Sequence, residues 1–311
     1  MKVLITGGAG FIGSNLTKHL FENTDYSIYI VDNLSNGNYH NIGKYLQSNR
    51  VFFKKIDIRS EEFFNYCVKI CPNIIYHMAA KVSVPLSFES PREYFDANVI
   101  GTQNCLEVAK VCSSKLVFSS SSSVYGNRND QANENDSLHP ISPYALSKKI
   151  GEEMCLFYNK VYGVETCILR YFNVYGPNQQ CSSAYSGVLS LFCNHKTKGK
   201  LPVIYGDGSQ SRDFTYVDDI VKVNYLVSKK ILSGQIFNAA PGESTSLNMI
   251  LKKLEIPNAV YKDKRDGDIS YSCSDSSALK KFINYSFKYD IDRGLKKYLK
   301  HLNDKLLEKN R

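Results

Sequence analysis

The sequence predicts an α/β protein with a doubly wound parallel sheet of the Rossmann type and a smaller, mixed α/β C-terminal lobe. Two observations predict this fold. In the first half of the chain, short β-rich runs alternate with longer segments of helical spacing, a pattern typical of parallel sheets covered by helices on both faces. A glycine-rich loop also follows the first β-rich run directly and opens a helix.

The expected elements follow one another in a regular order. The β-rich runs lie at residues 2–6, 27–32, 50–55, 73–78 and 115–119, and a further strand is expected at 165–171. The segments of helical spacing lie around residues 13–22, 60–70, 93–112 and 144–162. After about residue 176, Gly, Pro and Ser become more frequent and the elements shorter, which indicates a second lobe that covers a ligand.

The composition indicates a soluble globular protein and excludes several other classes. Of the 311 residues, 43% are hydrophobic and 22% are charged. No run approaches 18 apolar residues and the chain starts directly on a strand, so we expect neither a membrane span nor a signal peptide. The nine scattered cysteines lack the spacing of a zinc site or a redox motif, which favours free thiols in the cytoplasm.

The net charge of +9 raises the question of an anionic partner. Much of the excess lies in the C-terminal segment, where Leu295, Leu299, Leu302 and Leu306 recur at helical spacing. This spacing predicts an amphipathic surface helix with a solvated lysine face. Because no nucleic-acid-binding signature accompanies it, we expect neither a nucleic acid nor a membrane as partner.

The stretch "TGGAGFIGSN" carries Gly7, Gly10 and Gly13 between the first strand and the first helix. Glycines there let the backbone approach a pyrophosphate, and the helix N-terminus offers free N–H groups. Asp32 ends the next strand, where a carboxylate can bind an adenosine ribose and repels a 2′-phosphate. The pattern therefore predicts NAD as the cofactor rather than NADP, with Asp57 and the following residue beside the adenine.

In "SPYALSK", Tyr144 and Lys148 are four residues apart on an expected helix and so share one face. A phenol is a weak base at neutral pH, and a neighbouring ammonium group and an oxidised nicotinamide both lower its pKa. Tyr225 and Lys229 have the same spacing, but no other motif surrounds them. Tyr144 instead begins the helix that follows Ser121 in the serine run, which singles it out as a candidate base.

Together these motifs resemble the extended short-chain dehydrogenases/reductases, and among them the nucleotide-sugar 4-epimerases. The resemblance runs from residue 1 to about residue 280. The segments that carry it are "DNLSNG", "YHMAAKVSVPLS", "NVIGTQN", "FSSSSSVYG", "PYALSK", "LRYFNVYGP", "IYGDGSQSRDFTYVDD" and "RDGDISYSCSD". It implies an NAD-binding domain over residues 1–175 to which some later segments return, a mainly substrate-binding lobe over 176–311, and a homodimer formed through the helices around 93–112 and 144–162.

The resemblance further implies that Ser121, Tyr144 and Lys148 catalyse NAD-dependent epimerisation of a UDP-sugar at carbon 4 through a transient 4-keto intermediate. Related 4,6-dehydratases carry Asp-Glu in the two positions after the serine, and the decarboxylases that make UDP-xylose carry Glu in the second. This chain has Ser122 and Ser123 there, and neither can act as a carboxylate acid or base. The chain therefore lacks the acidic side chains that elimination and decarboxylation need, whereas epimerisation does not need them.

Two sets of binding residues follow from the same resemblance. The cofactor set comprises Gly7, Gly10, Phe11, Ile12, Gly13, Asp32, Asn33, Ser35, Asp57, Ile58, Ala79, Ala80, Asn98, Tyr144, Lys148 and Tyr171. The substrate set comprises Ser83, Ser121, Ser122, Ser123, Tyr144, Asn173, Val188, Tyr205, Arg212, Arg265, Asp268 and Ser272. Either arginine could instead form a surface ion pair with the aspartate that follows it. His77 is expected to be structural, and no metal site is predicted.

Ser272 aligns with the residue that lies beside the sugar's 2-substituent in these enzymes. A small side chain there leaves room for an N-acetyl group, which favours UDP-GlcNAc and UDP-GalNAc, with UDP-Glc and UDP-Gal as a further pair. A UDP-glucuronate 4-epimerase and a 4-ketoreductase stay open as enzymatic alternatives. A non-catalytic NAD(H)-sensing protein is the alternative from outside catalysis, but such relatives lack the tyrosine that this chain keeps.

Overall fold

The computed structural model describes residues 1–180, 187–264 and 269–309 and confirms the predicted doubly wound fold. Seven parallel strands form one sheet in the order β11-β6-β5-β4-β1-β2-β3. Their bounds are β1 Lys2–Thr6, β2 Ser27–Asp32, β3 Val51–Lys55, β4 Ile74–His77, β5 Lys115–Ser121, β6 Thr166–Tyr171 and β11 Gln235–Ala239. The strand order reverses between β1 and β4, and folds of this type bind ligands at the carboxyl ends of the strands beside that point.

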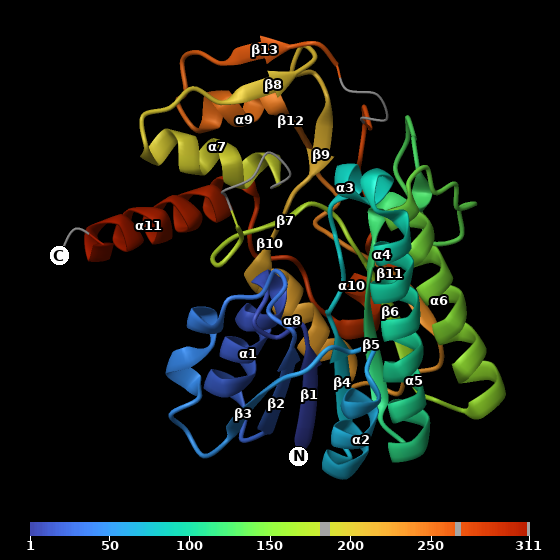
Figure 1. Ribbon diagram of the computed structural model, residues 1–311. Helices are drawn as coiled ribbons and strands as arrows, with labels where there is room; N and C mark the ends of the chain where they lie inside the picture. Colours follow the sequence, from blue (N-terminus) through green and yellow to red (C-terminus); the bar gives the residue numbers. More distant parts are fainter. Residues whose placement is uncertain (181–186, 265–268, 310–311) are drawn as a thin grey trace.

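Helices cover both faces of the sheet (Figure 1). One layer contains α1 (Phe11–Asn23), α8 (Val217–Ser228) and α10 (Ser277–Ile283), and the other contains α2 (Glu61–Ile70), α5 (Gly101–Cys112) and α6 (Pro143–Tyr162). Successive side chains of a strand point to opposite faces, so Val3 and Ile5 of β1 pack with the first layer and Leu4 with the second. This two-sided burial explains why the strands are almost continuously apolar.

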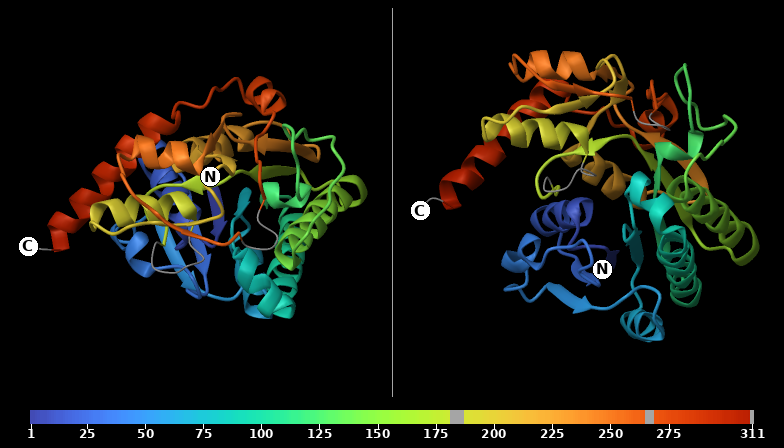
Figure 2. Two further views of the ribbon diagram at one scale, coloured as in Figure 1. Left: turned by 90° about the horizontal axis from the view of Figure 1, so that it is seen from above. Right: turned by 45° about the horizontal axis from the view of Figure 1, so that its top comes forward.

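A smaller lobe lies beyond the carboxyl ends of the strands, at the top of Figure 1, and Figure 2 shows it from two further directions. Its elements are β8 Val203–Tyr205, β9 Ser211–Asp213, β12 Ser244–Ser246, β13 Val260–Lys262, α7 Val188–Thr197, α9 Leu247–Lys253 and α11 Ile291–Lys309. Phe192, Ile250 and Leu295 meet in its core. None of the helices in the described ranges is long and apolar enough to cross a membrane.

The chain passes between the sheet and the lobe more than once. The segments β7 (Val174–Tyr175) and β10 (Thr215–Tyr216) pair beside the sheet, and β11 then joins the sheet next to β6. The lobe therefore contains segments from both before and after β11. The division of the chain at residue 175 stays a prediction.

The helix expected around residues 93–112 is interrupted. It consists of α4 (Pro91–Phe95), a π-helical turn over Asp96–Ile100, and α5. A π-helical turn contains one more residue than an α-helical turn and often marks a functional site. Here it carries Asn98, which belongs to the predicted cofactor set, inward to a fully buried position.

Candidate active site

The glycine-rich loop between β1 and α1 fits a dinucleotide pyrophosphate. Gly10 N donates to Gly7 O (3.0 Å), which folds the loop tightly. A Cβ on Gly13 would lie 2.7 Å from Gly8 Cα and closer still to Gly7 O, while a Cβ on Gly7, which has φ +69°, would lie 2.7 Å from Ala79 N. Gly10 caps α1 without a side chain that could accept from the helix, so the first N–H groups suit an anion.

Asp32 lies at the carboxyl end of β2, directly beside this loop. Its carboxylate accepts hydrogen bonds from Ala9 N (3.0 Å) and Leu34 N (2.8 Å). Burial raises the pKa of Asp32, and these backbone hydrogen bonds oppose the rise. The carboxylate is thus fixed at the loop that would hold the pyrophosphate, as a ribose-binding acid requires.

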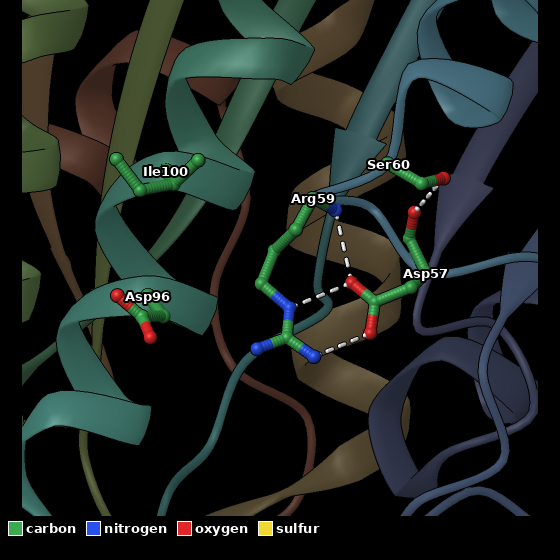
Figure 3. A pocket seen from close by; sticks show the side chains of 5 residues that line it. All are labelled: Asp57, Arg59, Ser60, Asp96 and Ile100. Atoms are coloured by element: carbon green, nitrogen blue, oxygen red, sulfur yellow. Dashed lines mark hydrogen bonds and ion pairs between the residues drawn. The ribbon is translucent and has the colours of Figure 1, made fainter.

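Asp57 follows β3 and is more firmly held than the sequence suggested. Arg59 donates to the carboxylate from Nε (2.9 Å), Nη2 (2.7 Å) and its backbone N (2.9 Å), and Asn33 adds a fourth hydrogen bond (3.0 Å). The arginine hydrogen bonds hold the pKa of Asp57 well below its usual range. Figure 3 shows Asp57 and Arg59 lining an open pocket of about 470 Å³ with Ser60, Asp96 and Ile100. The sequence did not single out Arg59, since an arginine in a loop is unremarkable by itself.

Asn98 and His77 support the site from within. The Asn98 amide accepts from Lys81 N (2.8 Å) and donates to Lys81 O (3.0 Å) and to Ser147 Oγ (2.9 Å). It therefore joins the loop after β4 to α6. His77 makes hydrogen bonds to Thr6 Oγ1 (2.8 Å) and Thr102 Oγ1 (2.9 Å), and its burial lowers its pKa to about 3. His77 is therefore neutral and hydrogen-bonded through both ring nitrogens, as expected of a structural residue.

The three predicted catalytic residues come together where β5 ends and α6 begins. The Tyr144 hydroxyl shares a hydrogen bond with the Ser121 hydroxyl. Lys148 Nζ donates to Ser119 O (2.8 Å), two residues earlier on the same strand. Ser142 caps α6 by accepting from Ala145 N (3.1 Å), which fixes the helical turn that presents Tyr144. Only 8% of Tyr144 and 4% of Lys148 are exposed, so both groups lie in a poorly solvated place.

Burial moves the pKa values of this pair in the directions that disfavour charge. It raises the pKa of Tyr144, an effect that the hydrogen bond from Ser121 opposes. It lowers the pKa of Lys148 to about 8. The sequence-based expectation is that the lysine and an oxidised nicotinamide together lower the tyrosine pKa. In the chain alone, burial and the neighbouring Tyr94 raise the pKa of Tyr144 and only Ser121 opposes them. Ionisation of Tyr144 therefore needs a further favourable charge.

Ser122 and Ser123 begin the 3₁₀ turn that follows β5, which spans Ser122–Tyr125. Ser123 N donates to Ser121 Oγ (3.2 Å), so the turn is bonded to the candidate catalytic serine. The Ser123 hydroxyl oxygen is buried and has no hydrogen-bond partner among the described residues. Because a buried hydroxyl without a partner is costly, this oxygen fits a contact with a ligand.

Arg212 and Asp213 lie next to each other on β9 and face opposite ways. Asp213 points inward, where its Oδ2 accepts from Ser274 N (3.0 Å), Ser274 Oγ (2.8 Å) and Gly242 N (3.1 Å). Alternation along the strand places the Arg212 side chain on the opposite face. Asn173 Nδ2 donates to Asp213 O (3.2 Å), which joins this strand to the segment after β6. Burial raises the pKa of Asp213 to about 6.

The remaining predicted substrate residues lie in the lobe or at its edge. Ser272 N donates to Ser211 O (3.1 Å), which fixes it beside β9. Tyr205 ends β8 and lines a pocket of about 210 Å³ with Gln210 and Lys264. Val188 begins α7, and Ser83 caps α3 (Val84–Glu89). Arg265 and Asp268 lie outside the described residues.

The other predicted cofactor residues lie at the carboxyl ends of the strands or in the segments that follow them. Phe11 and Ile12 form the first turn of α1, and Ser35 N donates to Asn33 Oδ1 (3.0 Å). Ala79 and Ala80 follow β4, and Ile58 packs against Gly101 at the start of α5. Tyr171 is buried, with its hydroxyl bonded to Ser119 and Asn224.

The second Tyr/Lys pair of the sequence has a different environment. Tyr225 and Lys229 lie at the end of α8, where Lys229 Nζ contacts the hydroxyl of Tyr26. The Tyr225 ring packs edge-on against His19 of α1. This pair lies in the layer opposite α6 and therefore does not approach Ser121.

Comparisons with known proteins show the family and the fold. The profile of the family described as "NAD dependent epimerase/dehydratase family" matches residues 3–240. A structure of UDP-glucose 4-epimerase with UDP-glucose from Thermotoga maritima superposes with a TM-score of 0.93. It is 33% identical in sequence and covers 98% of this chain and 100% of that chain.

Two further solved structures that resemble this chain are enzymes named for other UDP-sugars. A UDP-N-acetylglucosamine 4-epimerase from Methanobrevibacter ruminantium M1, in complex with UDP-N-acetylmuramic acid, has a TM-score of 0.90, 34% identity and coverage of 98% of both chains. A UDP-glucuronic acid 4-epimerase from Bacillus cereus, in complex with UDP-glucuronic acid and NAD, has a TM-score of 0.89 and 29% identity, and covers 98% of this chain and 99% of that chain. The fold is shared over almost the whole chain, whereas the named sugar differs.

Proposed function

We propose that this chain, which belongs to the NAD-dependent epimerase/dehydratase family, is a UDP-sugar 4-epimerase. The observation that carries the proposal is the Ser121–Tyr144–Lys148 group, assembled in a buried place where β5 meets α6. The turn that follows holds Ser122 and Ser123 where elimination would need acids. When bound, NAD supplies the group that accepts a hydride from carbon 4 of the sugar and returns it.

Tyr144 is the proposed base. As a phenolate it takes the proton of the sugar's 4-hydroxyl, and Ser121 donates a hydrogen bond to the same oxygen. Burial raises the pKa of Tyr144, so its ionisation depends on nearby positive charge. Lys148, with a pKa of about 8, still carries its proton at neutral pH and provides part of that charge. The rest of that charge would come from the oxidised nicotinamide when NAD is bound.

Epimerisation requires that the enzyme hold the nucleotide and leave the sugar free to turn. Arg212 and Asn173 are the proposed anchors of the diphosphate, and they are joined through the Asp213 backbone. The guanidinium group suits a phosphate because its planar fork donates two hydrogen bonds at once. An anchor on the diphosphate keeps the nucleotide in place while the 4-keto sugar presents its other face.

UDP-GlcNAc and UDP-GalNAc are the proposed main substrates, with UDP-Glc and UDP-Gal as a second pair. The support is the small side chain of Ser272, held beside β9 by its backbone. An N-acetyl group is larger than a hydroxyl and needs such space. One solved neighbour named for UDP-N-acetylglucosamine is 34% identical to this chain. A UDP-glucuronate 4-epimerase is the competing assignment, because a similar neighbour is named for that sugar.

A second copy of this chain is the proposed partner, bound through α5 and α6. These two helices expose a set of large apolar side chains: Val111, Leu146, Leu156, Phe157, Val161 and Tyr162. The rings of Phe157 and Tyr162 pack together, and a contiguous apolar surface of this kind is typical of an interface. Light scattering should give twice the chain mass of 35.2 kDa, and Phe157→Glu should reduce it to one chain. A wild-type monomer would contradict this partner.

Product analysis tests the activity and the sugar together. The enzyme is incubated with UDP-GlcNAc, UDP-Glc and UDP-GlcA separately, and the products are identified by proton NMR. We expect UDP-GalNAc from the first, at the highest kcat/KM, and UDP-Gal from the second. Conversion of UDP-GlcA alone would contradict the proposed substrates and identify a UDP-glucuronate 4-epimerase. Stoichiometric consumption of added NAD(P)H would indicate a 4-ketoreductase instead.

A further inference from the structure

A buried ion pair lies directly behind the serine run. Glu152 of α6 and Arg170 of β6 each have side chains that are only 2% exposed. Arg170 donates from Nε to Oε1 (3.0 Å) and from Nη2 to Oε2 (2.7 Å), a two-pronged contact. Removing two charges from water is costly, and a buried pair is often no more stabilising than apolar residues of the same size. Stability alone is therefore a weak explanation for this pair.

Glu152 is bonded to the strand that carries the candidate catalytic serine. Ser120 Oγ donates to Glu152 Oε1 (2.5 Å), and Ser120 immediately precedes Ser121. Lys148, four residues earlier on the same face of α6, donates to Ser119 O (2.8 Å). Strand β5 and helix α6 are thus joined by two adjacent contacts, one from the proposed catalytic lysine and one from Glu152.

Arg170 holds the other end of the same segment. Its Nη1 donates to the Tyr125 hydroxyl (2.8 Å), and its guanidinium lies 4.8 Å from the centre of the Tyr125 ring. Tyr125 in turn donates to Asn238 Oδ1 (2.7 Å). Tyr125 ends the turn that begins at Ser122. The ion pair therefore holds the segment 120–125 at both ends, and Ser121 lies between the two contacts.

We propose that Glu152, held in place by Arg170, is a positioning residue that keeps Ser121 and Lys148 correctly placed relative to Tyr144. This inference rests on the proposed epimerase function. Glu152 is enclosed by Ser120, Arg170 and its own helix, so it acts through these neighbours and not by contact with substrate. A misplacement of about 1 Å at reacting groups can cost up to about 100-fold in rate. Loss of the Glu152 contact to Ser120, one residue before Ser121, should therefore lower the rate.

The charge of Glu152 also affects Lys148. Burial lowers the pKa of Lys148, and the Glu152 carboxylate opposes this effect. The other groups that face the ammonium are Cys155 on α6, a thiol that burial keeps neutral, and His77 on β4, whose pKa is lowered by burial and by the lysine. Lys148 must keep its proton for Tyr144 to ionise. Loss of the Glu152 charge lowers the pKa of Lys148 further, so kcat should begin to fall at a lower pH on the alkaline side.

Three variants test the positioning role in the full-length protein. Ser120→Ala removes only the contact to the strand and leaves the ion pair intact. Glu152→Gln keeps the shape and removes the charge. Glu153→Gln is the matched control, because the next residue along α6 is 66% exposed and pairs only loosely with Lys149 (4.0 Å).

We expect kcat to fall at least about tenfold in Ser120→Ala and further in Glu152→Gln, with KM changed less than about twofold. The alkaline limb of the pH profile should shift to lower pH in Glu152→Gln alone. Hydrogen exchange measured by mass spectrometry should accelerate at residues 119–125 in both variants and stay unchanged in Glu153→Gln. If Glu152→Gln does not fold because Arg170 is left unpaired, the kcat and exchange rates of Ser120→Ala alone test the positioning role.

The outcomes separate this inference from the proposed function. Wild-type protein that converts no UDP-sugar would refute the function, and the exchange rates would still decide whether Ser120 and Glu152 hold the segment. Active wild type together with wild-type kcat and exchange in Ser120→Ala would refute the positioning role. A loss of rate in Glu153→Gln equal to that in Glu152→Gln would refute it as well.

Discussion

Tyr144 and Lys148 share one face of α6, and the same burial moves their pKa values in opposite directions. The tyrosine becomes harder to ionise and the lysine easier to deprotonate. Ser121 favours the phenolate through its hydrogen bond, and Ser119 fixes the ammonium through its carbonyl. At the scale of single residues, the site is thus ordered before any ligand contact, and its activation depends on added positive charge.

Replacing Tyr144 with Phe should lower kcat by roughly 10²–10⁴-fold or more, because the proposed base is lost. The NAD content of the purified protein, measured after denaturation, should be unchanged. Tyr225→Phe is the control, since Tyr225 has the same spacing to a lysine but packs against His19 in the opposite helical layer. A fully active Tyr144→Phe enzyme would overturn the assignment of the base.

Replacing Ser272 with Tyr should remove acetamido sugars first. A bulky ring beside the 2-substituent excludes an N-acetyl group before it excludes a hydroxyl, so kcat/KM for UDP-GlcNAc should fall more than about tenfold relative to UDP-Glc. The two values are measured on the same preparation. Retention of UDP-GlcNAc with loss of UDP-Glc would show that the steric explanation is wrong.

At the scale of elements, the local patterns predicted most of the sheet, and tertiary pairing accounts for the rest. The strands at 2–6 and 27–32 have the predicted bounds, because apolar runs and a glycine loop mark them locally. The helix around 93–112 contains a π-helical turn that no apolar period reveals. The contact between Glu152 and Arg170 joins α6 to β6, and a sequence shows only that Glu152 shares a helix face with Lys148.

The loop between β1 and α1 should not tolerate a side chain at Gly13. In Gly13→Ala the new Cβ would lie 2.7 Å from Gly8 Cα, so the loop must move away from α1. We expect a loss of ~1–3 kcal/mol in the free energy of unfolding and a lower NAD content. Gly43→Ala is a suitable control, because its Cβ would make only an ordinary contact at 3.9 Å with Tyr39. Equal NAD content in Gly13→Ala and wild type would contradict the proposed pyrophosphate site.

At the scale of the whole molecule, the lobe is joined to the sheet domain through buried polar groups as well as apolar packing. Asp213 binds the turn at Gly242 and the segment at Ser274, while its backbone carbonyl accepts from Asn173. These contacts join residues that are between 29 and 61 positions apart in the chain. They were not predictable from the sequence, which placed Asp213 only as a neighbour of Arg212.

Asp213 gives stability a definite dependence on pH. Its pKa is about 6 in the folded chain against 3.8 ordinarily, so the folded state binds more protons between those values and stability falls as pH rises through them. The shift of about two units corresponds to ~3 kcal/mol. Urea unfolding of wild type and Asp213→Asn between pH 4 and 7 should show wild type losing most of this amount relative to the variant. If the free energy of unfolding changed with pH equally in both proteins, groups other than Asp213 would be the cause of this pH dependence.

The central claim is that the hydrogen on carbon 4 leaves the sugar as a hydride and returns to the same sugar. UDP-GlcNAc carrying deuterium at carbon 4 tests it directly, with product formation followed by NMR and mass spectrometry in ordinary water. The account predicts UDP-GalNAc that retains the deuterium at carbon 4. Product in which the deuterium has been exchanged for solvent hydrogen would contradict it, because it would show that the bond to carbon 4 is broken by loss of a proton.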